Sequence, residues 1–326
     1  MSIQVSMRRH FTFGPQRETS TMNGLAGAFS LCRAISETLR MRRLRFSADL
    51  ADLTSFGKMR IYGSGAARLL SASCKSDMNT LPSGQAREIY WTNDGGGVRG
   101  NGTVARFGEE NFVLESFDTD IEWFSGVAER FGAKVRNEHA EKSGLLLAGP
   151  LATKILSEAE LDAASTLGPE HHEIYDWNGI SVTVSRRARL GGFEMSCIKE
   201  DAVVLFDRLV DAGQSYALSL IGQEALELLC LETSLLLSGL DYMLARNLGN
   251  TNPSAAALGF SDTETDGEFA ANVLIGVEWD GAEPASCAPL FSNGTEVGRT
   301  LRSAYSPALQ RVIATANVRA NCAAHG

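Results

Sequence analysis

The chain has 326 residues and is acidic, with 39 aspartates and glutamates against 30 lysines and arginines and a net charge of −9. Hydrophobic residues make up 44% of it, so it can bury large cores, and its length suits two or three domains of about 100–150 residues. No apolar run reaches the roughly 18 residues of a membrane span, and an acidic surface repels a phosphate backbone. Neither a membrane nor nucleic acid is therefore expected as a partner.

The charge is distributed unevenly along the chain. Residues 1–45 contain eight arginines, no lysine and two glutamates, which gives +6 and leaves −15 for the remaining residues. An arginine-rich, acid-poor leader is typical of an organelle transit peptide. The alternatives are a variable N-terminal extension and a helix near residues 26–45 with a basic exposed face.

Cysteine and histidine patterns argue against a disulfide framework and a metal site. The six cysteines include no CxxC pair, which fits reduced thiols in the cytoplasm, with the mitochondrial matrix as a minor alternative. The one histidine cluster, His171 and His172 followed by Glu173, is interpreted as a solvated loop rather than a ligand set. No metal is expected.

The first half of the chain predicts a mixture of strands and helices. Alternating apolar residues indicate strands, and apolar residues at helical spacing indicate helices, with Asp118 as a plausible N-cap. The strands around the glycine-rich turn at 95–97 are expected to form an antiparallel meander. In chain order we expect a strand at 58–62, a helix at 66–73, strands at 88–91, 104–107 and 111–115, a helix at 118–131 and a strand at 144–148.

The second half continues in the same way and then becomes all-β. A helix is expected after Gly149 and Pro150, followed by strands at 180–184 and 193–195 and by helices at 201–212 and 223–245. From residue 269 onward, short strands separated by turn residues suggest a small barrel or sandwich. The predicted fold class is therefore α+β with an appended β domain. The expected C-terminal strands are 272–279, 296–302 and 311–318.

The glycine-rich segment at 95–102 could be mistaken for a nucleotide-binding loop. A phosphate loop needs a following helix whose amide groups point at the anion. Residues 103–107 instead read as a strand, so the segment is interpreted as a hairpin turn. The residues alone establish only an acidic α+β protein with more than one domain.

Several segments, taken in order, resemble the folate-dependent one-carbon transfer family typified by the glycine cleavage T-protein. The likeness runs from roughly residue 44 to residue 318. The segments that carry it are DLTSFGK at 52–58, TNDGGGV at 92–98, GPLA at 149–152, LETSLLLSG at 231–239, EVG at 296–298 and SAYSP at 303–307. Within the family, FVLESFDTDIEW at 112–123, LGGFEM at 190–195 and NTNP at 250–253 are more similar to dimethylsulfoniopropionate demethylase and related folate-dependent demethylases.

The resemblance implies a three-domain ring of the aminomethyltransferase type that binds tetrahydrofolate as its cofactor. The domains would be a basic extension at 1–45, two interleaved α+β folate-binding domains at 46–248 and a C-terminal β-barrel domain at 249–326. The implied activity is transfer of a methyl or aminomethyl group from a small donor to tetrahydrofolate, by a transferase that could be a homodimer. The sequence identifies neither the donor nor a protein partner such as a lipoyl carrier.

The resemblance also assigns candidate site residues. Asn101 falls where the family has its reactive acid, and Glu194 and Glu232 are the acids retained from matched motifs. Glu232 lies in an apolar helix, where a lone carboxylate needs a partner, whereas Glu194 could equally be a salt-bridge partner. The further cofactor-binding candidates, which lie at the hairpin, are Tyr90, Trp91 and Asn93, and the basic residues expected to steer an anionic ligand are Arg99 and those at 186–189.

Some family positions carry residues that cannot do the family's chemistry. Leu190, Leu226 and Cys230 stand where the family has charged or polar groups, and Glu115 stands where a serine is usual. Each lost hydrogen bond to a charged group costs roughly 1.5–3 kcal/mol. A second hypothesis therefore stays open, in which the chain is a non-catalytic relative with a decayed folate site that acts as a binding or regulatory protein.

Overall fold

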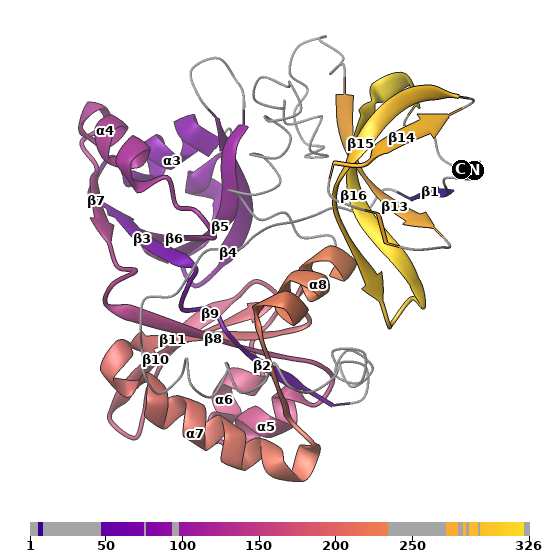
Figure 1. Cartoon of the computed structure of the whole chain (residues 1–326). Coiled ribbons are helices and arrows are strands. Elements are labelled where there is room, and N and C mark those ends of the chain that lie inside the picture. The colour runs from indigo at the N-terminus through magenta and orange to yellow at the C-terminus, as the bar shows by residue number, and fades with distance from the viewer. Residues whose placement is uncertain are drawn as a thin grey trace. The chain divides into compact units, whose positions relative to one another are not determined.

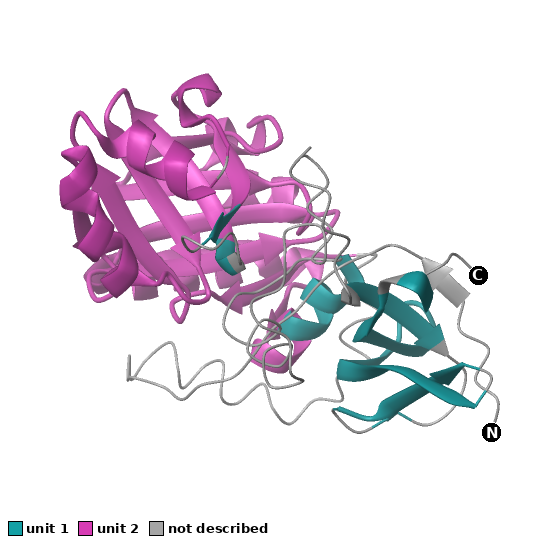
Figure 2. Cartoon of the chain, turned by 90° about the horizontal axis from the view of Figure 1, so that it is seen from above, with its two compact units in different colours: residues 1–15, 90–101, 227–326 teal, residues 16–89, 102–226 magenta. Residues whose placement is uncertain are grey.

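The structure is a computed structural model that describes most of the chain in two compact units. Unit 1 comprises residues 1–15, 90–101 and 227–326, and unit 2 comprises residues 16–89 and 102–226 (Figure 2). The described residues are 6–8, 47–74, 76–92, 98–233, 272–279, 283–284, 287–292 and 294–322.

The first sheet of unit 2 has six strands (Figure 1). Its strands are antiparallel except for β12, which lies parallel to β2 at one edge. In spatial order they are β12 (Ser219–Ile221), β2 (Asp49–Asp52), β8 (Lys142–Ala148), β11 (Gly192–Ile198), β10 (Ile180–Arg187) and β9 (His172–Trp177).

A second sheet contains the predicted meander. β4, β5 and β6 are consecutive neighbours, which confirms that prediction, and β3 then pairs antiparallel with both β6 and β7. β5 is longer than expected, because residues 98–103 already belong to the strand. The first part of the predicted hairpin turn, residues 95–97, lies outside the described residues. In spatial order the strands are β4 (Ala86–Thr92), β5 (Val98–Gly108), β6 (Asn111–Ser116), β3 (Gly57–Tyr62) and β7 (Lys134–Asn137).

The helices fall close to the predicted positions. α3 (Ala66–Cys74) and α7 (Ala202–Gly213) match their predicted spans within one or two residues. α5 (Ala152–Glu158) follows Gly149 and Pro150 as expected, and the short α6 (Asp162–Ser165) was not expected. α8 (Gln223–Thr233) covers the first part of the helix predicted at 223–245, whose remainder lies outside the described residues, as does the helix considered at 26–45. None of the described helices is long and apolar enough to cross a membrane.

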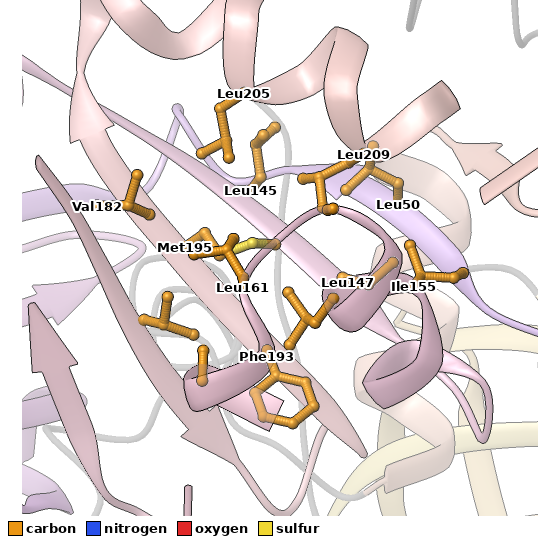
Figure 3. Packing of buried hydrophobic residues seen from close by; sticks show 14 of the residues in the cluster. Leu50, Leu145, Leu147, Ile155, Leu161, Val182, Phe193, Met195, Leu205 and Leu209 are labelled. Atoms are coloured by element: carbon orange, nitrogen blue, oxygen red, sulfur yellow. The ribbon is translucent and has the colours of Figure 1, made fainter. Parts of the chain in front are cut away.

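The main core of unit 2 lies on one face of the six-stranded sheet (Figure 3). Because side chains alternate along a strand, every second residue of β8 and β11 points to this face. Helices α5, α6 and α7 supply the other side of the core. Its fully buried members include Leu50, Leu145, Leu147, Ile155, Val182, Phe193, Met195, Leu205 and Leu209.

Unit 1 contains the all-β segment predicted from residue 269 onward. Its sheet has the order β1-β13-β16-β15-β14, and a small core of apolar residues that includes Ile275, Val277 and Val318 packs on it. The strand β1 belongs to the N-terminal basic segment and pairs antiparallel with β13, which the sequence did not suggest. The strands are β1 (Ser6–Arg8), β13 (Asn272–Trp279), β14 (Pro289–Ser292), β15 (Thr295–Ser306) and β16 (Arg311–Arg319).

The helix predicted at 118–131 begins later than expected. α4 (Ile121–Phe131) starts after Asp120, which has a left-handed backbone with a φ of 52°. The Oδ1 atom of Asp118 accepts a hydrogen bond from the backbone N–H of Asp120 at 3.0 Å. Asp118 therefore shapes the turn that precedes the helix and does not cap it.

The histidine pair is not a solvated loop, so that prediction was wrong for His172. His172 begins β9 and is 5% exposed, and its Nε2 atom lies 3.1 Å from the carbonyl oxygen of Arg106 on β5. Its ring also packs against Phe107 with centroids 4.3 Å apart. The imidazole thus connects β9 of the six-stranded sheet with β5 of the second sheet.

His172 should make unit 2 sensitive to acid. Burial lowers the pKa of this imidazole below its ordinary value. The folded chain therefore releases a proton that the unfolded chain would hold, and stability is lost as the pH falls below about 6.5, the ordinary histidine pKa. Urea unfolding at pH 7.5 and pH 5 should show a smaller acid loss for His172→Gln than for the wild type. Equal acid losses would contradict this role.

Candidate functional site

Four ionisable side chains lie buried together in unit 2, and they are called the charge cluster here. Their side chains are between 3% and 17% exposed, which is unusual for charged groups. Two come from each sheet. The charge cluster consists of Lys58 on β3, Glu115 on β6, Arg187 on β10 and Glu194 on β11.

Strand register brings these residues to one place. Lys58 and Glu115 are direct cross-strand partners in the antiparallel pair of β3 and β6. On β11, Glu194 lies between two core residues and so points to the face opposite the helices. Its partner on β10 is Ser185, and Arg187 lies two residues further along on the same face. The cluster therefore links the two sheets on their charged faces.

The two cations do not contact the two carboxylates equally. The Nε atom of Arg187 lies 3.0 Å from Oε2 of Glu194, whereas its Nη2 atom lies 3.8 Å from Oε2 of Glu115. The Nζ atom of Lys58 lies 3.8 Å from Glu194 and 4.0 Å from Glu115. Only the Arg187–Glu194 pair is within hydrogen-bond distance. Glu194 is thus the better-compensated carboxylate.

This asymmetry separates the pKa values of the two acids. Burial, and then the charge of Glu194, raise the pKa of Glu115 to about 7 against the opposing charges of Lys58 and Arg187. Burial also opposes ionisation of Glu194, but the charges of Arg187 and Lys58 lower its pKa. At neutral pH the cluster therefore contains one firmly ionised carboxylate beside one that readily holds a proton.

The Lys58 ammonium group is packed tightly into the cluster. Its side chain is 3% exposed, and among the described residues Nζ has no hydrogen-bond acceptor within range. A Cβ atom placed on Gly144 would lie 3.0 Å from Nζ and 3.2 Å from Cβ of Leu53. Glycine at this position of β8 therefore leaves the space that the ammonium group needs.

Two of the four cluster residues were expected from the sequence to act on the ligand, Glu194 in cofactor binding and Arg187 in steering an anionic ligand. Glu194 was a candidate, and its interpretation as a salt-bridge partner is confirmed by the contact with Arg187. Lys58 ends a matched motif, Glu115 was noticed as a departure from the family, and Arg187 lies in the basic run at 186–189. The signal that was missed is that a buried charge requires an opposite charge beside it.

Glu232, the other retained acid, has a different environment. In unit 1 its Oε1 atom accepts a hydrogen bond of 2.5 Å from the Oγ atom of Ser306, and that Oγ also accepts one of 3.0 Å from the Leu309 N–H. Glu227 of the same helix lies 3.6 Å from Arg302 of β15. Glu232 therefore has the partner that a carboxylate in an apolar helix requires.

The two aromatic candidates before the hairpin are buried. Trp91 is fully buried and Tyr90 is 9% exposed, which favours core packing, most clearly for Trp91. Asn101 lies on β5, two residues before Thr103, which is the cross-strand partner of Glu115. Asn93 lies outside the described residues.

Gly100 is required by the Trp91 indole. A Cβ atom on Gly100 would lie 2.4 Å from Cζ2 of that ring, which is far inside van der Waals contact. We expect Gly100→Ala to lower the free energy of unfolding by about 1–3 kcal/mol, the usual cost of overpacking a core. Gly108→Ala is the matched control on the same strand, because its Cβ would meet its nearest neighbour at 3.8 Å. Urea unfolding measures both, and equal losses would contradict the steric account.

Comparison with known proteins gives consistent matches. Residues 33–261 match the family described as the GCVT N-terminal domain. An aminomethyltransferase of Geobacillus sp. (strain WCH70) is 26% identical over 314 residues, which cover 89% of this chain and 83% of that protein. The trimethylamine-oxide aldolase of Ruegeria pomeroyi is 27% identical over 297 residues, 82% of this chain but 37% of that protein.

A solved structure matches as well. The glycine cleavage system aminomethyltransferase T from Bartonella henselae superimposes with a TM-score of 0.72 and 21% identity, covering 88% of this chain and 82% of that one. This likeness shows the fold, which is the aminomethyltransferase fold with mixed α and β content. The family match spans more than two thirds of the chain. The chain therefore belongs to the GCVT family of folate-dependent one-carbon transferases, as the ordered motifs predicted.

Proposed function

We propose that the chain transfers a methyl or aminomethyl group from a small donor to tetrahydrofolate. Family membership supports the class of reaction. The observation in this chain that carries the proposal is Glu194, a carboxylate that is 4% exposed and yet held ionised by Arg187 and Lys58. Burying an ionised acid is costly, and sites that do so are often functional.

The cluster fits the chemistry of a pterin ring. Such a ring presents several N–H donors, and hydrogen bonds from N–H groups to an ionised carboxylate are among the stronger ones in proteins. Glu194 would accept them, while Glu115 and Arg187, at 17% and 15% exposure, form the more accessible edge of the cluster. Bound tetrahydrofolate would supply the nitrogen that takes the one-carbon unit, and the chain would hold the reactants in line and exclude water.

The finer assignments are part of the same proposal. Asn101 would face the reacting nitrogen as an uncharged hydrogen-bonding group, and Glu232, Tyr90, Trp91 and Asn93 would contribute to cofactor binding. A demethylase-like and an aminomethyltransferase-like donor are both compatible with these residues. The three-domain ring with its C-terminal barrel, its predicted boundaries and the homodimer also belong to the proposal.

Calorimetric titration with tetrahydrofolate tests the proposal. We expect wild type to bind and Glu194→Gln to bind about ten- to a hundred-fold more weakly, the cost of one charge-assisted hydrogen bond. Glu110→Gln, at an exposed acid on the β5–β6 turn, is the matched control and should bind as wild type does. Unfolding midpoints of both variants check that each remains folded.

A second ligand separates the pterin from the rest of the cofactor. p-Aminobenzoylglutamate contains the tail of folate without its pterin, so any binding of it should be unaffected by Glu194→Gln. Equal weakening of both ligands would mean that Glu194 acts through the fold and not through the pterin.

The alternative is a non-catalytic relative that binds or regulates. It is favoured by Leu226 and Cys230, which are 3% and 1% exposed and offer no charged hydrogen bond where the family has arginines. No detectable heat and no thermal shift at millimolar tetrahydrofolate would support this alternative and contradict the folate proposal.

A further inference from the structure

The Lys58 ammonium group differs from the other charges of the cluster in having no close partner. Its side chain is 3% exposed, and its Nζ atom finds no hydrogen-bond acceptor in the part of the chain that the structure describes. Buried polar groups in proteins are nearly always hydrogen bonded, so such an exception requires a physical reason. We propose that Lys58 is a ligand-binding residue whose ammonium group donates a hydrogen bond to the carbonyl oxygen of the pterin ring. The identity of the ligand rests on the proposed function.

Charge balance alone does not explain where Lys58 lies. A buried ammonium group that only compensates a carboxylate normally contacts it, with the two atoms about 2.7–2.9 Å apart. The Nζ atom instead lies 3.8 Å from Glu194 and 4.0 Å from Glu115, which is too far for a hydrogen bond to either. Glu194 already has the Nε atom of Arg187 at 3.0 Å. The N–H groups of Lys58 are therefore left for an acceptor that none of the described residues supplies.

The surroundings of the ammonium group indicate where that acceptor would enter. A Cβ atom on Gly144 would already lie 3.0 Å from Nζ, so β8 packs too closely against Lys58 to admit a ligand atom there. The accessible side chains of the cluster are those of Glu115, the cross-strand partner of Lys58, at 17% exposure and Arg187 at 15%. The flexible four-carbon stem of a lysine lets its ammonium group turn toward a ligand that binds at this edge.

A carboxylate beside an ammonium group matches one edge of a reduced pterin. That edge presents an amino group and a ring N–H, which donate, next to a carbonyl oxygen, which accepts. Glu194 can accept from the two donors, and Lys58, whose Nζ atom lies 3.8 Å from the Glu194 carboxylate, can donate to the carbonyl oxygen. A hydrogen bond with an ionised donor is roughly twice as strong as one between neutral groups. Such a site should reject a ligand that carries a donor in place of the carbonyl oxygen.

Calorimetric titration at pH 7.5 with two ligands tests this role. The ligands are tetrahydrofolate and its amino analogue, in which an amino group replaces the pterin carbonyl oxygen. Wild type should bind tetrahydrofolate about ten-fold or more tightly than the analogue. In Lys58→Met this preference should shrink about ten-fold, because the ammonium group that distinguishes the two ligands is gone. The analogue also lacks the neighbouring ring N–H, but that contribution cancels, since both proteins keep Glu194.

Two further variants separate a ligand contact from charge balance. Lys154→Met removes an exposed lysine of α5, on the opposite face of the sheet from Glu194, and should keep the wild-type preference. Lys58→Met combined with Glu115→Gln removes one charge of each sign and should still show the ten-fold smaller preference, measured against Glu115→Gln alone. Unfolding midpoints show that each variant is folded, and the double variant gives the comparison if Lys58→Met alone is too unstable to titrate. A preference restored in the double variant would mean that Lys58 only balances charge and would overturn the proposal.

The outcomes also distinguish this role of Lys58 from the proposed function. Tetrahydrofolate binding that depends on Glu194, with equal ligand preferences in wild type and Lys58→Met, would overturn the role of Lys58 and leave the folate proposal standing. No tetrahydrofolate binding by wild type would overturn both.

Discussion

Replacing Arg187 with methionine is expected to lower the free energy of unfolding by about 3–5 kcal/mol at pH 7.5. The methionine removes the cation that lies 3.0 Å from Glu194 and 3.8 Å from Glu115. Removing one partner of a buried ion pair leaves an uncompensated buried charge, and that desolvation cost accounts for most of the loss. Urea unfolding followed by circular dichroism measures the change.

Two controls show whether charge is the cause. Arg189→Met removes a neighbouring arginine whose pair with Glu88 is largely exposed, at 47% and 36%, so we expect a loss within about 1 kcal/mol. Adding Glu194→Gln to Arg187→Met should restore part of the stability, because the unpaired carboxylate is then gone. Equal losses for Arg187→Met and Arg189→Met would contradict a buried charge cluster.

Glu115→Gln should make the chain more stable than wild type in alkaline solution. The pKa of Glu115 is raised from 4.5 to about 7 on folding, so the folded chain takes up a proton. The stability that this proton contributes is complete below pH 4.5 and is lost as the pH rises through 7. Glutamine stays neutral at every pH, so at pH 8.5 the variant should exceed wild type by roughly 3 kcal/mol.

The comparison across pH is the informative part of this experiment. At pH 4.5 wild type and Glu115→Gln should have similar unfolding free energies, and the gap should open between pH 5 and pH 8. Glu110→Gln should follow wild type throughout. The stability that depends on His172 changes with pH in the opposite sense, because it is lost as the pH falls. A constant difference between wild type and Glu115→Gln would mean that Glu115 does not titrate on folding.

Local patterns in the sequence predicted most of the described elements. Alternating residues located β3, β10 and β13, and helical spacing located α3 and α7, because these segments are long enough to show a period. Strands of three or four residues, such as β2, β7 and β12, are too short to show an alternating pattern in the sequence. β9 was missed because its side chains do not alternate cleanly, with only His172 and Trp177 buried.

The charge cluster could be predicted only in part. Gly191 and Gly192 indicate a turn that brings Arg187 close to Glu194, so this pair follows from local sequence. The pairing of Lys58 with Glu115 joins residues far apart in the chain, and its register is set by the whole sheet. The meeting of the two pairs depends on how two sheets pack, which a single sequence does not reveal.

The most direct test of the account is a calorimetric titration of wild type and Glu194→Gln with tetrahydrofolate at pH 6.5, where Glu115 is largely protonated. We expect wild type to bind and Glu194→Gln to bind about ten- to a hundred-fold more weakly. Glu110→Gln, run alongside, should bind as wild type does. Equal affinities for wild type and Glu194→Gln, or no binding by wild type, would contradict it.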